Sequence, residues 1–266
     1  AVTDSVTGDT ISIEGHVLDG PVMGGTIQVV DIFAQVIATA YSDYQGKYRV
    51  ELKANTRFPV GLEMTGGVDL VSNEEVTVTL KSLVINAQTV VANISPLTTL
   101  IYETSLAATS TGNLADITTA EVAQATALVV PHFGFGIDAE EADMNPLSTR
   151  LSNNNLMSSM LANQALAELS KRVMGDSSND QQLFFTALAE DLLDGKTDGR
   201  NSELDLQTPL PEGMIGTSLL AKVQLHSTAI SLEVMRHQLE VSRVDSGRLS
   251  AGFVEDKLIN TFKRLV

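Results

Sequence analysis

The chain has 266 residues, of which 43% are hydrophobic and 19% are charged, so it can fold around one large core or two ordinary ones. Its 17 Lys and Arg against 33 Asp and Glu give a net charge of −16, which argues against nucleic-acid binding, because that depends on neutralising phosphates. The sequence contains no Cys, which excludes disulfides, thiolate zinc sites and thiol catalysis within it.

The first ten residues are polar and rich in Thr and Ser, and they precede the first clear strand pattern. We predict that residues 1–10 form an extended N-terminal arm. Such an arm can fray in solvent, or it can be donated as a strand to the sheet of a neighbouring subunit. The sequence starts at Ala1 without an initiator Met, as it would after signal-peptide cleavage, so we expect a secreted protein.

Residues 11–90 carry the pattern of short β-strands. Apolar and polar residues alternate in five runs, which places the apolar side chains of each strand on one face. Gly, Pro and Asp separate the runs, and this is typical of an antiparallel β-sandwich. The runs cover residues 11–17, 27–29, 48–52, 60–64 and 76–80.

After about residue 95 the period changes to that of an α-helix, so residues 91–266 are predicted to form an α-helical bundle. Ser95 stands before a proline, and Thr118 stands three positions before a glutamate; both patterns are typical of helix starts. The second helix is expected to stop near Pro131. The other four helices are expected over about 147–174, 180–194, 215–240 and 246–265.

The fold class predicted from these patterns is α+β, with an N-terminal antiparallel β-sandwich followed by an α-helical bundle. The two parts meet between Leu80 and Ser95, where no Gly/Ser-rich or Pro-rich linker is found. We therefore expect a close, rigid contact between them.

Two segments of the β-rich part resemble carboxypeptidase regulatory-like domains. They are residues 15–27 and residues 42–48, and in the second Asp43 and Gly46 suit a tight hairpin turn. The resemblance implies a seven-stranded, transthyretin-like (Ig-like) β-sandwich, an accessory module without catalytic activity on secreted and surface proteins. Residues 94–100 resemble the junction that follows such modules in bacterial secreted proteins, which implies a location outside the cytoplasm.

No motif predicts an enzyme. The histidines form no zinc-peptidase pattern, and neither a Gly-x-Ser-x-Gly elbow nor a Gly-rich phosphate-binding motif is present. The sequence has no Trp and an aromatic content of 5%, which leaves few stacking platforms for a sugar-cleaving cleft. Two carboxylates that meet only in the folded state would be the basis of a hydrolase. The histidines are His16, His132, His226 and His237.

Asp191, Asp194 and Asp198 are the candidate ligands for a cation. They lie in an Asp- and Gly-rich stretch after a predicted helix, and Ca²⁺ prefers hard carboxylate oxygens. The stretch lacks the alternating ligands and terminal Glu of an EF-hand, so it equally fits a helix end followed by solvated turns. No other cofactor is predicted.

The sequence therefore predicts a non-catalytic extracellular structural or interaction protein. In this interpretation it is a self-assembling subunit of a surface fibre or matrix, or an adhesion module, whose N-terminal arm is available for strand donation. The alternative is a surface module that binds a glycan or Ca²⁺, and the third is a hydrolase with a composite carboxylate site. The expected partners are copies of the chain, with a surface glycan or another protein as the alternative. Neither nucleic acid nor a membrane span is expected, because no apolar run reaches the ~18 residues that a bilayer requires.

Overall fold

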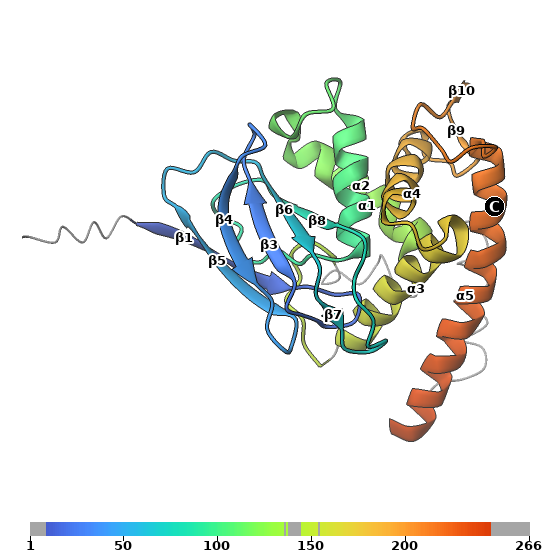
Figure 1. Ribbon diagram of the computed structural model, residues 1–266, viewed down its shortest axis with the longest axis horizontal. Helices are drawn as coiled ribbons and strands as arrows, with labels where there is room; N and C mark the ends of the chain where they lie inside the picture. Colours follow the sequence, from blue (N-terminus) through green and yellow to red (C-terminus); the bar gives the residue numbers. More distant parts are fainter. Residues whose placement is uncertain (1–8, 136, 138–144, 154, 246–266) are drawn as a thin grey trace, which may run out of the picture.

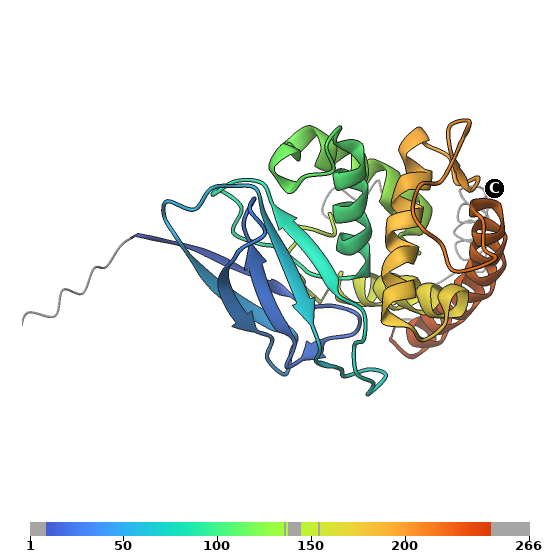
Figure 2. The same ribbon diagram turned by 45° about the horizontal axis from the view of Figure 1, so that its top comes forward.

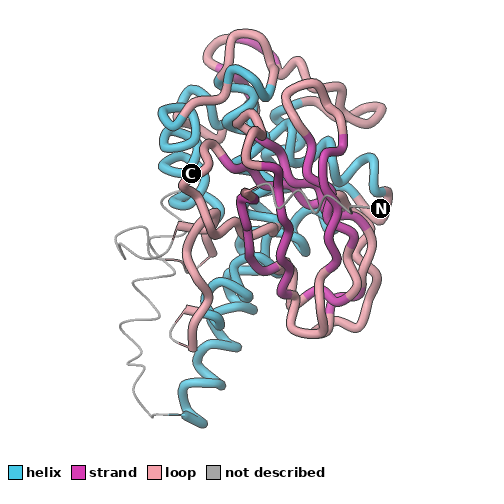
Figure 3. Tube along the Cα trace, turned by 90° about the vertical axis from the view of Figure 1, so that its left-hand side faces the viewer, coloured by secondary structure: helices cyan, strands magenta, loops and turns pink. Residues whose placement is uncertain are grey.

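The protein has a mixed α+β fold with antiparallel sheets and five α-helices in the part described. The computed structural model describes residues 9–135, 137, 145–153 and 155–245. Figure 1 shows the main strands on one side of the molecule and the helices on the other, and Figure 3, from the strand side, shows these strands in front of the helices. The predicted α+β class is confirmed.

The main strands form two sheets. In the first, β1 (Thr10–His16) pairs with β5 (Lys47–Lys53) in an antiparallel register that sets Thr10 opposite Lys53. The second sheet has the order β4-β3-β6-β8, and each neighbouring pair is antiparallel. Its strands are β3 (Thr26–Val30), β4 (Val36–Tyr41), β6 (Val60–Thr65) and β8 (Leu80–Val84). Two short pairs join β2 (Val22–Met23) to β7 (Val68–Asp69) and β9 (Arg200–Asn201) to β10 (Leu204–Asp205).

Four of the five predicted strand runs coincide with β1, β3, β5 and β6. The fifth prediction, residues 76–80, is wrong: Val76 and Val78 are buried, but the strand in this region, β8, begins only at Leu80. The alternating apolar residues in this segment are buried, but before Leu80 the segment does not pair with a neighbouring strand in the described part of the chain. Strand β4 was not predicted, and its properties are described below.

The helices are α1 (Pro96–Ala108), α2 (Thr119–Phe133), α3 (Leu156–Met174), α4 (Ser178–Asp191) and α5 (Gly216–Asp245), with short 3₁₀ turns at Leu114–Asp116 and Leu192–Asp194. Both predicted helix starts are confirmed, because Ser95 and Thr118 each form a capping box with the residue three positions later. Gly195 has a φ of +83° and ends the turn after α4.

Three helix boundaries differ from the prediction, and one of them is the end of α5, which reaches Asp245 instead of ending near residue 240. Helix α2 continues past Pro131 to Phe133, whose fully buried ring holds the last turn in the core. Helix α3 begins at Leu156 instead of near residue 147, and Asn155 accommodates the start without a side-chain cap. The helix predicted over residues 246–265 lies outside the described residues.

One hydrophobic cluster runs through both parts of the chain, from core residues of the sheets such as Val29 and Leu62 to helix residues such as Leu100 and Phe184. Helix α1 lies between the sheets and α4 (Figure 2) and contacts β8. All residues from 91 to 100 are buried. The expected close contact between the two parts is therefore confirmed.

Asn93 joins three segments at this junction. Its buried side chain accepts a hydrogen bond from the backbone N–H of His16 (3.2 Å). Its amide nitrogen donates to the carbonyl oxygens of Pro146 (3.3 Å) and Thr149 (2.8 Å). A single amide thus ties strand β1 to the segment that precedes α3, because both its oxygen and its nitrogen are in use.

Candidate functional site

The edge strands of the sheets are candidate interaction sites, since an exposed edge offers free backbone N–H and C=O groups to another chain. The edge of β1 is covered by residues 90–94. The N–H of Ala92 donates to the carbonyl of Glu14, and the N–H of Ile94 donates to that of His16, both at 2.9 Å. A Cβ atom on Gly15 would lie 1.8 Å from the Ala92 oxygen, so the backbones approach closely only because this residue is glycine.

The edge of β8 is covered by the first turn of α1. The hydroxyl oxygen of Thr99 accepts a hydrogen bond from the N–H of Lys81 (2.8 Å). The hydroxyl of Thr98 donates to the Lys81 carbonyl (2.6 Å). Two helix side chains thus satisfy the backbone groups that a further strand would otherwise bind.

The remaining edges of β4 and β5 have no strand partner among the described residues, although the two strands contact each other. Strand β4 pairs with β3 alone and β5 pairs with β1 alone, and no strand within the described part of the chain pairs with their other sides. The two strands follow each other through a tight turn, in which the Asp43 carboxylate accepts hydrogen bonds from the N–H groups of Gln45 and Lys47. Gly46 supplies the positive φ of +73° that this turn needs, as predicted. The two open edges therefore lie on the same side of the molecule.

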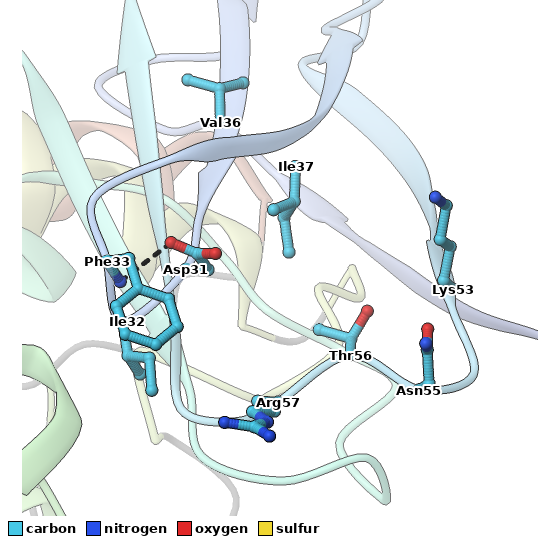
Figure 4. Close-up of a pocket in the computed structure, with 9 residues that line it drawn as sticks. All are labelled: Asp31, Ile32, Phe33, Val36, Ile37, Lys53, Asn55, Thr56 and Arg57. Atoms are coloured by element: carbon cyan, nitrogen blue, oxygen red, sulfur yellow. Dashed lines mark hydrogen bonds between the residues drawn. The ribbon is translucent and has the colours of Figure 1, made fainter.

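A cleft of about 470 Å³ lies between these edges (Figure 4). We call it the β4–β5 cleft. Figure 4 shows the side chains of Ile37, Thr56 and Phe33 around the same hollow, with Arg57 at one side of it. Its lining consists of Asp31, Ile32, Phe33, Val36, Ile37, Lys53, Asn55, Thr56 and Arg57.

Apolar side chains of the cleft are unusually exposed. The relative exposure is 67% for Phe33, 50% for Val36 and 39% for Ile37, although β-branched and aromatic residues are normally buried by a sheet. The register between β3 and β4 shifts at this point, which leaves Ile37 as an extra, bulged residue. Grouped apolar side chains at a strand edge are a recognised mark of a contact surface.

The charge of the cleft contrasts with that of the chain. Lys53 and Arg57 both line it, and neither forms an ion pair with another described residue. One oxygen of the Asp31 carboxylate accepts hydrogen bonds from the N–H groups of Phe33 and Gln35, each at 2.9 Å. The cleft therefore presents two cations and one carboxylate to an incoming group, in a protein whose net charge is −16.

The predicted Ca²⁺ ligands have local roles in the structure. One oxygen of the buried Asp191 carboxylate accepts hydrogen bonds from the N–H groups of Asp198 (3.1 Å), Gly199 (3.0 Å) and Arg200 (3.2 Å). The Asp194 carboxylate accepts from the N–H groups of Lys196 and Ser202, and that of Asp198 from Arg200. These carboxylates hold the loop that follows α4, and Ca²⁺ binding there stays a prediction.

Burial raises the pKa of Asp191 to about 7, while the three backbone N–H donors act in the opposite direction by stabilising its ionised form. Within the residues the structure describes, no group of three or more His, Asp or Glu side chains is close enough together to hold a metal ion.

Two further sites contain a histidine or a pair of carboxylates, side chains that acid–base chemistry commonly uses. His16 lies in a second cleft of about 300 Å³ beside Lys47, and burial followed by the Lys47 charge lowers its pKa. Asp19 and Asp69 are the carboxylates whose charges interact most clearly: burial, then Asp69, raises the pKa of Asp19 to about 7. The side chain of Asp69 accepts hydrogen bonds from the loop that follows β7. Neither carboxylate lines the β4–β5 cleft or the cleft of His16.

Residues of the β4–β5 cleft escaped the sequence analysis. Ala38 and Ala40 are the residues of β4 that contact the core, while Val36 and Ile37 face outward. The large apolar side chains of β4 are therefore exposed while alanines contact the core, so period-two alternation does not mark β4 in the sequence.

Comparisons of this chain with protein-family models, with curated proteins and with solved structures found no match. Among the described residues, no helix has the length and apolar content needed to cross a bilayer.

Proposed function

We propose that the protein is a non-catalytic structural or interaction protein of the cell surface, a subunit that associates with copies of itself through the β4–β5 cleft. The observation that carries this proposal is that some sheet edges are covered by other segments of the chain and others are not. Backbone and hydroxyl groups cover β1 and β8, whereas β4 and β5 are open around exposed apolar side chains. A strand added there would satisfy backbone groups and cover Phe33 and Ile37 at the same time.

We also propose the finer architecture from which this function follows. The two main sheets are the layers of a transthyretin-like β-sandwich, and the helices after residue 95 form a bundle. Support comes from Val50 of one sheet and Leu62 of the other, which belong to one buried cluster, and from the contacts of α1 with α2, α3 and α4. The resemblance of residues 15–27 and 42–48 to carboxypeptidase regulatory-like domains favours the same architecture and a location outside the cell.

The test measures self-association of the full chain by sedimentation velocity over a range of concentrations, with negative-stain microscopy of the most concentrated sample. We expect wild-type protein to form dimers or larger assemblies. Replacement Ile37→Lys places a charge on the open edge and should weaken association by at least about tenfold, because a buried unpaired ammonium opposes strand addition.

The matched control is Leu204→Lys, which adds the same charge at an exposed apolar residue of β10, on the helical part of the chain. It should associate like the wild type. Wild-type protein that stays strictly monomeric at high concentration, with and without Ca²⁺, would overturn the proposal, as would equal weakening by both substitutions.

A further inference from the structure

The partner of the β4–β5 cleft can be narrowed to a short segment of the chain itself. Strand β1 begins at Thr10, opposite Lys53, and Lys53 lines the cleft. Strand β1 therefore begins at the end of the molecule that carries the cleft, and residues 1–8, which we call the donor segment, precede it in the sequence. At ~3.3 Å per residue, eight extended residues span about 26 Å, more than the six-residue strand β4.

The donor segment has the composition of a strand. Its sequence is Ala-Val-Thr-Asp-Ser-Val-Thr-Gly, in which Val and Thr favour an extended backbone. In a strand with period two, Val2, Asp4 and Val6 share one face, and Thr3, Ser5 and Thr7 share the other. One face is thus apolar with a single central carboxylate, and the other consists of hydroxyl groups.

The first of these faces complements the cleft. Val2 and Val6 are apolar, as are the exposed side chains of Phe33 and Ile37 that line the cleft. The carboxylate of Asp4 matches Lys53 and Arg57, which form no ion pair with another described residue. The donor segment contains no Lys or Arg, so Asp4 is its one charged side chain and has the opposite charge to Lys53 and Arg57.

The donor segment of a second copy fits this cleft better than that of the same subunit. Asp9 leaves β1 on the side where its carbonyl accepts the N–H of Ala54. The next residues, 55–57, line the cleft, so the start of β1 lies beside the loop that forms one wall of the cleft. A second copy can approach the cleft from outside without passing this loop.

We infer that residues 2–7 of one subunit add as a strand to the open edge of β4 in a second subunit, with Val2, Asp4 and Val6 turned into the β4–β5 cleft. This inference rests on the proposed self-association and identifies the segment that carries it. The recognition is of main-chain groups by β4, of apolar side chains by Phe33 and Ile37, and of one carboxylate by Lys53 and Arg57.

Disulfide trapping tests the inference directly, because the chain has no Cys of its own. Full-length Val6→Cys protein is mixed with full-length Ile37→Cys protein under mild oxidation, and the products are separated without reductant. We expect a covalent dimer that contains one copy of each variant. Thr7→Cys, on the opposite face of the donor segment, is the matched control and should give several-fold less of this dimer with Ile37→Cys.

Binding of a fluorescently labelled peptide of residues 1–8 gives a second test. The protein in this experiment is the chain from which only residues 1–8 have been deleted. Binding should weaken at least about tenfold when the peptide carries Asp4→Lys, and much less when it carries Ser5→Lys. Raising the salt concentration should reduce the difference, because the Asp4 contact is ionic.

The outcomes separate the inference from the proposed function. If a Val6→Cys/Ile37→Cys double variant closes a disulfide within one chain and the mixed single variants give no dimer, the segment occupies its own cleft and the inference is wrong. If no trapping occurs while Ile37→Lys still abolishes association, subunits meet at the open edge through another segment. If trapping succeeds, both the inference and the proposed self-association are supported.

Discussion

Asp191 offers the sharpest test of how the structure uses its buried charges. Replacement Asp191→Ala removes an oxygen that accepts three backbone hydrogen bonds from residues 198–200. Asp191 is 2% exposed, and its hydrogen bond with the N–H of Gly199 is buried, so solvent cannot replace the acceptor lost by Gly199. The bonds to Asp198 and Arg200 are part-buried, and the N–H of Arg200 also donates to Asp198. Asp191→Asn keeps an oxygen at the same position without the charge.

The expected loss is set by these bonds. A hydrogen bond contributes ~0.5–1.5 kcal/mol between neutral groups and ~1.5–3 kcal/mol when one group is charged. With a pKa of about 7, Asp191 is about half ionised at pH 7, and three donors on one oxygen are not additive. We therefore expect Asp191→Ala to lower the free energy of unfolding by about 3 kcal/mol, and Asp191→Asn by about 1 kcal/mol. In a chain of this size, 3 kcal/mol corresponds to a fall in Tm of roughly 6–12 °C.

Urea unfolding followed by circular dichroism at pH 7 measures both variants against the wild type. An Asp191→Ala loss below about 0.5 kcal/mol would refute the reasoning, because the three hydrogen bonds would then carry no stability. Equal losses in Ala and Asn variants would show that the charge matters more than the acceptor. A Tm that Ca²⁺ raises in the wild type and leaves unchanged in Asp191→Asn would support the predicted cation site.

Three further predictions concern a glycine with a crowded backbone, a carboxylate with a raised pKa and the asparagine at the junction. Gly199→Ala should lower the free energy of unfolding by more than about 3 kcal/mol, because its Cβ would lie 2.5 Å from the backbone of Gly216 at a φ of +80°. Gly195→Ala, at a φ of +83° with open space around it, should lower it by only ~1–2 kcal/mol. Equal losses of the two variants in thermal melting would contradict this prediction. Burial raises the pKa of Asp19 from 3.8 to about 7, so between these pH values the folded state binds more protons than the unfolded state. The contribution of Asp19 to the free energy of unfolding should therefore fall, by about 3 kcal/mol at most, as the pH rises from about 4 to about 7. The pKa of Asp191 is also raised to about 7 and contributes a second fall over the same pH range, so Asp19→Asn should remove about half of the slope, and an unchanged slope would disprove the assignment. Asn93→Ala removes three hydrogen bonds at the junction and should lower stability by ~2–4 kcal/mol in urea unfolding, whereas a loss under ~1 kcal/mol would show that the junction does not depend on them.

Sequence patterns predicted the elements whose apolar residues face the core. Period-two alternation found β1, β3, β5 and β6, and the hydroxyl caps Ser95 and Thr118 located two helix starts, because in these elements local chemistry and burial agree. Residues 76–80 misled the prediction, since Val76 and Val78 are buried by neighbouring segments without a strand partner.

The candidate site was missed for the opposite reason. In β4 the residues that contact the core are alanines, and the large apolar side chains of Val36 and Ile37 face outward. Such a pattern cannot be recognised from alternation alone, because a strand is normally identified by its buried side. Which sheet edges are covered also depends on contacts between distant residues, such as Thr99 with Lys81, and no local pattern reports these.

The ten consecutive buried residues at positions 91–100 have a practical consequence for handling the protein. The loop around Val71 is exposed and is a natural site for a protease, whereas the segment that joins the two parts is shielded. A chain nicked in that loop would keep its strands packed against α1 through the shared core. The two pieces should therefore migrate as one particle on a native gel and separate only in detergent, so an apparently intact preparation can consist of cleaved molecules.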